Sequence, residues 1–384
     1  MKFEALRYDT FQPVSIRLAG EQIESVDPST ESAKSLPIVA PGFFDLQING
    51  YAGVWFGRPG ITADDVLKTL KAHYAFGLTH MFPTLITNSN ENLVNGFRAI
   101  REACEREAWA DRLVAGCHLE GPYLSGEDGP RGAHPREHIR PADWTEFEEL
   151  QHAAGGRIKL ITIAPETEGA IEFIRKAVSK GIVCSIGHTA AEPADIRNAV
   201  EAGAKMSTHL GNGSHGTIRR HPNYIWEQLA EDRLTACLIT DGHHLPDSVI
   251  KCMVRAKGVE NCLLTCDASG LAGCPPGVYP EEGHAVEVLE NGRIVVAGQR
   301  EYLAGSGAST DLCIGRAARF PEIGLEQACE MAGNRVRKLF GLPLVRLQAG
   351  SPADLTLFER DAKTGIIRIV GTIVAGKICY GDVG

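Results

Sequence analysis

The chain of 384 residues lacks any apolar stretch near the roughly 20 residues that a membrane-spanning helix needs. Its first six residues, Met1 to Leu6, also lack the long apolar core of a signal peptide. Basic residues are in deficit: 39 Lys and Arg stand against 48 Asp and Glu, which gives a formal net charge of -9. Such a chain has no basic field for nucleic acid or anionic lipid, so we expect it to bind neither nucleic acid nor a membrane. From the missing apolar segments we expect a cytoplasmic protein.

The sequence has no Cys-x-x-Cys pair of the kind that holds a structural zinc ion. Its 11 cysteines are odd in number and scattered, and several lie inside apolar runs, as Cys117, Cys184 and Cys237 do. This distribution indicates reduced thiols in the protein core rather than a disulfide framework.

Apolar, strand-like runs alternate with amphipathic stretches such as 170–179 and 194–202. The runs are almost continuously apolar, which is typical of parallel strands covered by helices on both faces. Eight such runs predict an α/β fold, a (β/α)8 TIM-like barrel, over residues 41–344. The eight runs are 42–47, 78–86, 113–118, 158–164, 182–187, 205–210, 235–241 and 262–267.

Both ends of the chain read as short β-strands without a long helix to cover them, at 14–18 and 22–26 near the start and at 354–358 and 366–370 near the end. A chain of this length exceeds the size of one core, so a second, smaller domain is expected. We predict a small β-sandwich domain built from residues 1–40 and 345–384. A further hairpin, 284–296, turning at Asn291-Gly292, is predicted as an insertion after the eighth barrel strand.

Polar side chains capable of chemistry follow several of the predicted strands, where the ends of parallel strands in a barrel converge on one site. Glu120, His188 and His209 are one carboxylate and two imidazoles, a ligand set typical of catalytic zinc sites. Taken singly, a histidine at a strand end is more often structural, and a glutamate before Gly-Pro is more often a turn residue. The joint occurrence on three strands favours a metal site.

Asp267 ends the eighth run, where a carboxylate beside a metal-activated water can accept a proton and return it to a leaving nitrogen. The alternative for Asp267 is a helix N-cap. His243 and His244 are adjacent, so in an extended segment only one of them would face the site.

The ordered motifs resemble the N-acetylglucosamine-6-phosphate deacetylase family of the amidohydrolase superfamily over nearly the whole chain. The resemblance implies a metal-dependent hydrolase with a (β/α)8 barrel and a small β-sandwich, which removes acetate from the 2-acetamido group of an amino sugar. The motifs are residues 41–50 (Pro-Gly-Phe-Phe-Asp-Leu-Gln-Ile-Asn-Gly), 118–122 (His-Leu-Glu-Gly-Pro), 187–189 (Gly-His-Thr), 208–210 (Thr-His-Leu) with Asn212, 241–244 (Asp-Gly-His-His), Asp267 and 303–306 (Leu-Ala-Gly-Ser).

The same resemblance implies a role for individual residues. It assigns metal binding to Glu120, His188 and His209, general acid/base catalysis to Asp267, and polarisation of the acetamide carbonyl to His244, which also contacts the sugar. Further substrate contacts are implied at His134, Asn212 and Gly213. Most amidohydrolases carry His-x-His on the first strand, whereas this chain has Gln47-Ile48-Asn49, so one divalent metal is expected: zinc first, with iron, cobalt or manganese as alternatives.

The loop after Thr208-His209-Leu210 departs from the family pattern. Arg220 keeps the spacing of the family's phosphate-binding arginine, which often acts across a homodimer interface, but His221 and Asn223 replace the residues that usually follow it. The alternative is that Arg219 and Arg220 are a solvated pair. We therefore predict hydrolysis of N-acetylglucosamine 6-phosphate by a homodimer, with two alternatives: deacetylation of an unphosphorylated or different N-acyl amino sugar, or a non-catalytic sugar-phosphate-binding protein.

Overall fold

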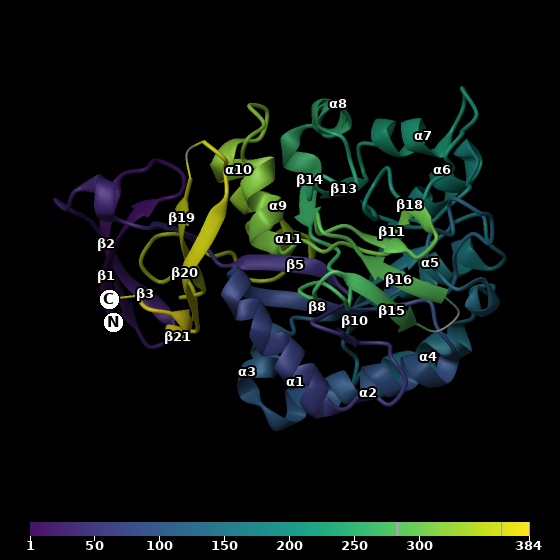
Figure 1. Ribbon diagram of the computed structural model, residues 1–384, viewed down its shortest axis with the longest axis horizontal. Helices are drawn as coiled ribbons and strands as arrows, with labels where there is room; N and C mark the ends of the chain where they lie inside the picture. Colours follow the sequence, from purple (N-terminus) through teal and green to yellow (C-terminus); the bar gives the residue numbers. More distant parts are fainter. Residues whose placement is uncertain (282–283, 362, 384) are drawn as a thin grey trace.

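The computed structural model describes residues 1–281, 284–361 and 363–383; the four others, 282, 283, 362 and 384, fall within the two predicted domains and lie outside the described residues. Eight parallel strands form one sheet in the order β14-β13-β12-β11-β10-β9-β8-β5, which confirms the predicted barrel (Figure 1). The strands are β5 (Phe43–Ile48), β8 (Leu78–Ile86), β9 (Cys117–Glu120), β10 (Ile158–Ile163), β11 (Val183–Ile186), β12 (Met206–Ser207), β13 (Thr235–Ile239) and β14 (Cys262–Thr265).

The barrel closes where its first strand, β5, meets its last, β14. A parallel bridge joins Ile48 to Ala268, and the fully buried Asp45 carboxylate accepts hydrogen bonds from the Thr265 hydroxyl and from the Cys266 N–H at 2.9 Å. The Thr310 hydroxyl adds a third hydrogen bond at 2.8 Å. Burial raises the pKa of Asp45, and these three donors oppose that rise. The seam that holds the site together is therefore partly polar.

One strand begins later than its sequence suggests. The apolar run 113–118 was predicted as a strand throughout, but Leu113 ends the helix α3 (Ala108–Leu113), and β9 starts only at Cys117. Val114 makes an isolated parallel bridge with Met81 between the two elements. Periodicity cannot separate a buried helix end from a buried strand start when both are continuously apolar.

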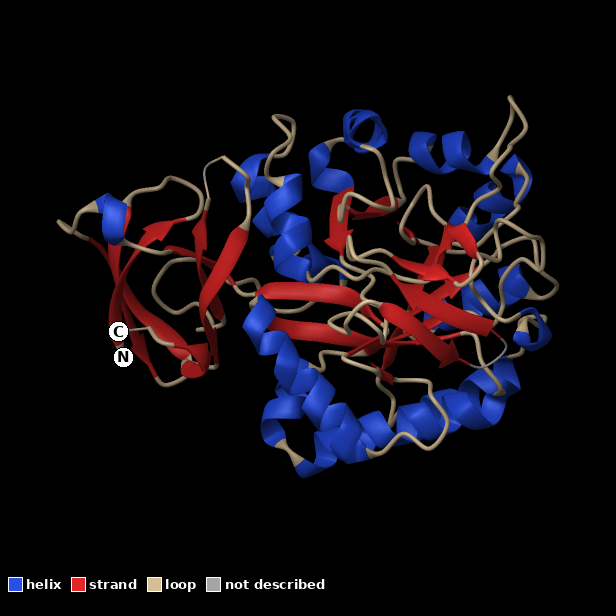
Figure 2. Ribbon diagram, viewed as in Figure 1, coloured by secondary structure: helices blue, strands red, loops and turns tan. Residues whose placement is uncertain are grey.

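Helices surround the barrel, and the two predicted helical stretches are confirmed as α5 and α6 (Figure 2). Among the described residues, no helix is both long enough and apolar enough to cross a membrane. Besides α3, the helices are α1 (Ala63–Ala72), α2 (Asn90–Arg106), α4 (Trp144–Ala153), α5 (Ala170–Ser179), α6 (Pro193–Glu201), α7 (Tyr224–Ala230), α8 (Asp247–Lys257), α9 (Thr310–Ala317), α10 (Gly324–Met331) and α11 (Asn334–Leu339).

The two chain ends form one seven-stranded sheet in the order β21-β20-β19-β4-β1-β2-β3, at the left of Figure 1, which confirms that both termini build one small β domain. Its central strand β4 pairs in parallel with β1 and antiparallel with β19. The domain division 1–40 plus 345–384 against 41–344 stays a prediction. The strands are β1 (Lys2–Arg7), β2 (Pro13–Ala19), β3 (Gln22–Pro28), β4 (Ile38–Pro41), β19 (Leu355–Arg360), β20 (Ile367–Val374) and β21 (Lys377–Gly381).

The predicted insertion is confirmed and is larger than expected. β16 (His284–Val288) and β17 (Ile294–Val296) form the predicted hairpin, and β15 (Gly277–Glu281) and β18 (Gln299–Leu303) extend it to a four-stranded antiparallel sheet. Gly292 has a φ of +82°, as the Asn-Gly turn requires. Figure 1 shows this inserted sheet lying across the barrel.

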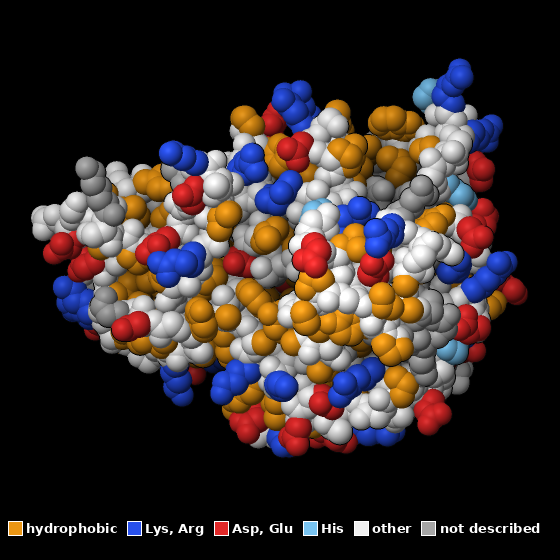
Figure 3. Space-filling view, viewed as in Figure 1, with side chains coloured by type: hydrophobic (Ala, Val, Ile, Leu, Met, Phe, Trp, Pro, Cys, Tyr) orange, Lys and Arg blue, Asp and Glu red, His pale blue; other side chains and the backbone are white. Residues whose placement is uncertain are grey.

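The core agrees with the expectation for the cysteines. All eleven are free thiols, and eight of them are buried. On the face seen in Figure 3, acidic and basic side chains are interspersed, in keeping with a small net charge rather than a field of one sign.

Candidate active site

A cavity of about 750 Å³ opens at the carboxyl ends of the barrel strands. Loops that follow β9, β11, β12, β13 and β14 line it, and the inserted sheet contributes one wall. All but one of the residues assigned a role from the sequence line this cavity: Glu120, His134, His188, His209, Asn212, Gly213, His244 and Asp267. Arg220 does not line it.

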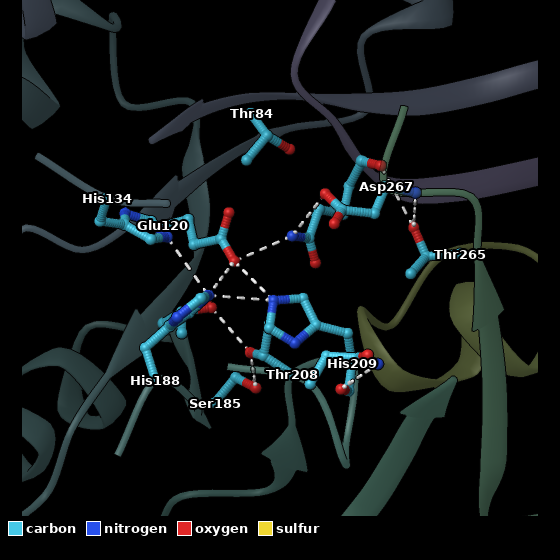
Figure 4. Close-up of polar contacts among 12 residues, drawn as sticks. Thr84, Glu120, His134, Ser185, His188, Thr208, His209, Thr265 and Asp267 are labelled. Carbon is cyan, nitrogen blue, oxygen red and sulfur yellow. Dashed lines mark hydrogen bonds and ion pairs between the residues drawn. The ribbon is translucent and has the colours of Figure 1, made fainter. Parts of the chain in front are cut away.

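Three predicted metal ligands converge at the floor of the cavity (Figure 4). His188 Nε2 lies 3.2 Å from Glu120 Oε1, His209 Nε2 lies 2.9 Å from the same oxygen, and the two nitrogens are 3.1 Å apart. Donors that share one tetrahedral zinc at about 2.0–2.1 Å lie roughly 3.3 Å apart. The three side chains, all at least 93% buried, therefore have the spacing of a metal-ligand set.

Hydrogen bonds to backbone and hydroxyl oxygens select one tautomer of the neutral ring for two histidines. His188 Nδ1 lies 2.8 Å from the Pro130 carbonyl, which can only accept, so this nitrogen carries the proton and Nε2 presents a lone pair. His134 Nδ1 lies 2.8 Å from the Thr87 hydroxyl, which in turn donates to the Glu120 carbonyl. His134 therefore also directs a lone pair from Nε2 toward the cluster.

These lone pairs face one another at short range, since His134 Nε2 is 3.2 Å from His188 Nε2. The ligand atoms of Glu120, His134 and His188 all lie within 4.8 Å of one another, so His134 belongs to the same cluster of donors as the predicted ligands. Converging lone pairs repel unless a cation lies between them. The donor chemistry of the site fits a divalent metal.

The backbone is strained where the functional side chains leave the strands. Among the described residues, six non-glycine residues have a positive φ, and three of them are His188, His209 and Asp267, at +51°, +27° and +51°. Such conformations cost of order 1–3 kcal/mol each and gather at functional sites. Gly213 contributes to the same geometry, because a Cβ there would lie 2.6 Å from His188 Nδ1, at a φ of +56°.

Asp267 lies beside this cluster and is held by two amide side chains. Its Oδ1 accepts hydrogen bonds from Gln47 Nε2 at 3.0 Å and from Asn49 Nδ2 at 2.8 Å, and Gln47 Nε2 also lies 2.9 Å from Glu120 Oε1. Burial and the nearby negative charge of Glu120 raise the pKa of Asp267 to about 6. Asp267 caps no helix; Ser309 precedes the next one.

His244 is oriented by Asp241, which lies two residues beyond the end of β13. Its Nδ1 lies 2.8 Å from Asp241 Oδ2, and both side chains are buried. Burial opposes ionisation of Asp241, but hydrogen bonds from the His244 ring and from two backbone N–H groups outweigh it and hold its pKa below the usual range. Because Asp241 contacts Nδ1, the other ring nitrogen of His244, Nε2, is left to contact a ligand in the cavity.

The expectation that only one of His243 and His244 faces the site is wrong, since both line the cavity. The expectation assumed extended backbone, where neighbours point oppositely. Instead the chain turns around Asp241 Oδ1, which accepts the N–H groups of His243 at 2.8 Å and His244 at 2.9 Å.

The segment that carries Arg220 lies beyond the cavity lining. Arg220 is exposed, and its backbone carbonyl accepts a hydrogen bond from Asn223 Nδ2 at 3.2 Å. Its neighbour Arg219 makes a solvated ion pair with Glu192 at 3.9 Å. Within one subunit, therefore, nothing brings Arg220 to the residues at the cavity floor.

Sequence reasoning missed four partners of the site. Gln47 and Asn49 were noted for lacking imidazoles, yet alternate residues at a strand end share a face, which could have indicated their common bond to Asp267. Asp241 was seen only as part of a motif. The Pro130 carbonyl that orients His188 has no signal in the sequence, because it is backbone from a distant loop.

Comparisons with known proteins agree with this geometry. Residues 38–379 match the Amidohydrolase family. The barrel, the small β domain and the polar strand ends thus define an amidohydrolase, an enzyme class that hydrolyses amides and typically uses a divalent metal.

Similar proteins indicate which family of amidohydrolases the chain belongs to. The chain is 31% identical to human N-acetylglucosamine-6-phosphate deacetylase over 89% of this chain and 83% of that protein, and 30% identical to the N-acetylgalactosamine-6-phosphate deacetylase of Shewanella sp. (strain ANA-3) over 88% and 82%. A crystal structure of N-acetyl-D-glucosamine-6-phosphate deacetylase from Mycobacterium smegmatis matches with a TM-score of 0.86 at 28% identity, covering 98% of both chains. The chain belongs to the N-acetylglucosamine-6-phosphate deacetylase family.

Proposed function

We propose that this enzyme hydrolyses the acetamide of N-acetylglucosamine 6-phosphate to glucosamine 6-phosphate and acetate. The observation that carries the proposal is the joint placement of Asp267 and the Glu120, His188 and His209 cluster, bridged by Gln47 within one cavity. That arrangement supplies a metal-ligand set and a separate proton carrier, which amide hydrolysis needs. The choice of N-acetylglucosamine 6-phosphate as the sugar follows from the similar proteins, which are named as deacetylases of that substrate.

Glu120, His188 and His209 would hold the metal, with His134 adjacent. We propose zinc, with iron, cobalt and manganese as alternatives, since a set of two imidazoles and one carboxylate suits all four. When bound, such a metal supplies Lewis-acid chemistry, which activates water and polarises an amide carbonyl.

Asp267 is proposed as the proton carrier. Both amide donors, Gln47 and Asn49, bind its Oδ1, which leaves Oδ2 for proton transfer. In its ionised form Asp267 takes a proton from the attacking water as the new C–O bond forms. It then gives this proton to the amine nitrogen as the C–N bond breaks, so acetate and the free amino sugar leave.

His244 is proposed to contact the sugar and to stabilise the carbonyl oxygen as negative charge develops on it. The Asp241 carboxylate, which lies 2.8 Å from His244 Nδ1, orients the ring for that task and leaves Nε2 free for the substrate. His134, Asn212 and Gly213 are proposed as further contacts to the substrate. Asn212 is fixed for this by a hydrogen bond to the His209 carbonyl at 3.0 Å.

Because Arg220 lies outside its own cavity, we propose that it reaches a substrate phosphate only from a second subunit of a homodimer. Exposed apolar side chains flank it, with Ile218 37% and Trp226 55% exposed. Arginine suits phosphate through its two parallel N–H groups.

The test is acetate release by metal-reconstituted enzyme from N-acetylglucosamine 6-phosphate and from N-acetylglucosamine. We expect kcat/KM at least about 100-fold higher for the phosphorylated sugar, and a loss of about 10²–10⁴-fold in kcat for Asp267→Asn. Equal activity on both sugars would favour an unphosphorylated substrate. Sugar-phosphate binding without any amine release would favour the non-catalytic alternative.

A second candidate substrate is N-acetylgalactosamine 6-phosphate. Relatives named for that sugar are 29–30% identical to this chain, and those named for the gluco epimer are 29–31% identical. The two sugars differ only at C4, so the same assay with both epimers separates them.

A further inference from the structure

One wall of the cavity comes from the inserted sheet rather than from the barrel. Val286 on β16, Arg293 in the turn before β17, and Tyr302 on β18 line it, above the strand ends that carry Asp267 and Glu120. The proposed mechanism uses none of these three residues. A substrate whose acetamide reaches Asp267 must extend toward some part of this wall or toward the open mouth.

The turn that carries Arg293 is tied to the inserted sheet and to the loop that leads from this sheet to α9. The Ala304 N–H donates to the Ile294 carbonyl at 3.0 Å, and the Leu289 N–H donates to the Arg293 carbonyl at 2.8 Å. The turn also sits directly on the loop before α9, because a Cβ on Gly307 would lie 2.2 Å from the Gly292 carbonyl oxygen. The Arg293 backbone is therefore held in a fixed position relative to Asp267.

Charge distinguishes Arg293 from the other basic groups at the cavity. Two arginines line it, Arg58 and Arg293. The Arg58 guanidinium is paired with Asp65 at 2.9 Å. Arg293 donates from Nη2 to the Arg300 backbone carbonyl at 2.9 Å, and within the described part of the chain no carboxylate forms an ion pair with it. Of these two arginines, Arg293 is therefore the one whose charge a ligand can neutralise.

We propose that Arg293 binds the anionic group of the substrate from within its own subunit. The inference rests on the proposed function, in which a hexosamine carries its phosphate at C6, away from the acetamide at C2. A planar guanidinium with free N–H groups pairs with two phosphate oxygens at once. Tyr302, which is 44% exposed, lines the same wall of the cavity.

The proposal gives the chain a phosphate contact that does not depend on Arg220. Arg220 keeps the family spacing but lies outside the cavity, whereas Arg293 lies inside it on an anchored turn. If both act, the partner's contribution adds to a site that each subunit already has.

The first experiment compares Arg293→Gln with Arg300→Gln, a matched control. Arg300 lies on the same sheet, but it is 66% exposed, is paired with Glu287 at 2.8 Å and does not line the cavity. For Arg293→Gln we expect kcat/KM to fall about 30-fold or more for the phosphorylated sugar, mostly through KM, and at least ten times less for the unphosphorylated sugar. Arg293→Lys should recover part of the loss, and Arg300→Gln should match the wild type.

Equal losses on both sugars, or no loss, would overturn the role of Arg293. A loss confined to Arg220→Gln would place the phosphate contact on that residue instead. Melting temperatures of all variants, expected within about 2 °C of the wild type, exclude misfolding as the cause.

A second measurement separates this proposal from the choice of substrate. Binding of inorganic phosphate to the metal-loaded enzyme is measured by calorimetry. Binding that weakens tenfold or more in Arg293→Gln, in an enzyme that deacetylates neither sugar phosphate, would keep the anion site and reject the proposed substrate. Unchanged phosphate binding in Arg293→Gln would reject the anion site even if the enzyme is a deacetylase.

Discussion

Gln47 Nε2 lies 3.0 Å from Asp267 Oδ1, across the seam where the first and last barrel strands meet. The same nitrogen lies 2.9 Å from Glu120 Oε1. One amide group therefore separates the proposed proton carrier from a proposed metal ligand and neutralises part of their mutual repulsion.

Replacing Gln47 by Leu should lower kcat about 10- to 100-fold and weaken metal binding, because both carboxylates lose a donor that orients them. Asn49→Ala serves as the graded comparison, since Asn49 donates to Asp267 but not to Glu120. We expect Asn49→Ala to keep its metal. Loss of that hydrogen bond also raises the pKa of Asp267, so the acidic limb of the pH profile of kcat should move to higher pH. An unmoved limb would contradict the assignment of Asp267 as base.

Removal of the metal by a chelator should abolish activity and lower the melting temperature. A metal at 100 times its Kd stabilises the folded state by about 2.7 kcal/mol. His188→Ala should lose the bound metal, measured by elemental analysis. His134→Ala, in contrast, should retain close to one equivalent and raise KM. Loss of metal in His134→Ala would make His134 a ligand.

Asp241→Asn should reduce kcat about 10- to 100-fold, since the variant loses the carboxylate that orients the His244 ring. The variant should also melt earlier, because Asp241 accepts the N–H groups of His243 and His244 and the Ser306 hydroxyl at 2.8 Å. Asp247→Asn is a nearby control with a 71% exposed side chain. A kcat equal to the wild type in Asp241→Asn would show that His244 needs no partner.

Asp311 provides a test of pH-dependent stability outside the site. Burial raises its pKa to about 6, and among the described residues its Oδ1 has no hydrogen-bond partner. A raised carboxyl pKa destabilises the folded state once the group ionises. This cost is absent below about pH 4 and complete above about pH 6.

Asp311→Asn should therefore stabilise the protein by roughly 2 kcal/mol at pH 8 and have little effect near pH 4. Asp64→Asn is the matched control, because Asp64 also lies in the first turn of a helix but its side chain is 78% exposed. Chemical denaturation at both pH values measures the difference. A gain of the same size at both pH values would contradict the prediction.

The sequence predicts the barrel well, because buried parallel strands leave continuous apolar runs, and all eight runs became strands. The strand-end residues Glu120, His188, His209 and Asp267 could be predicted together for the same reason: their positions along the strands place them at one end. The late start of β9 could not be predicted, since it coincides with a tertiary bridge between Val114 and Met81. The turn around Asp241 is local, made by an aspartate side chain that accepts the next N–H groups, and the assumption of extended backbone overlooked it.

The walls of the site are harder to predict than its floor. Arg293 and Arg220 both lie in loops, where neither strand register nor helical periodicity fixes the direction of a side chain. Arg220 keeps the spacing of the family's phosphate-binding arginine. Only the three-dimensional structure shows that Arg293 lines the cavity and Arg220 does not.

The small sheet joins the two ends of the chain, and this has a consequence for synthesis on the ribosome. β1 to β4 emerge first, but the edge of β4 that pairs with β19 stays open until residue 355 and those after it have been made. Throughout that interval the nascent chain carries an unpaired strand edge beside apolar side chains, a condition that favours association with other chains. A protein shortened at its end would keep that edge permanently, although every residue of the catalytic floor would be present.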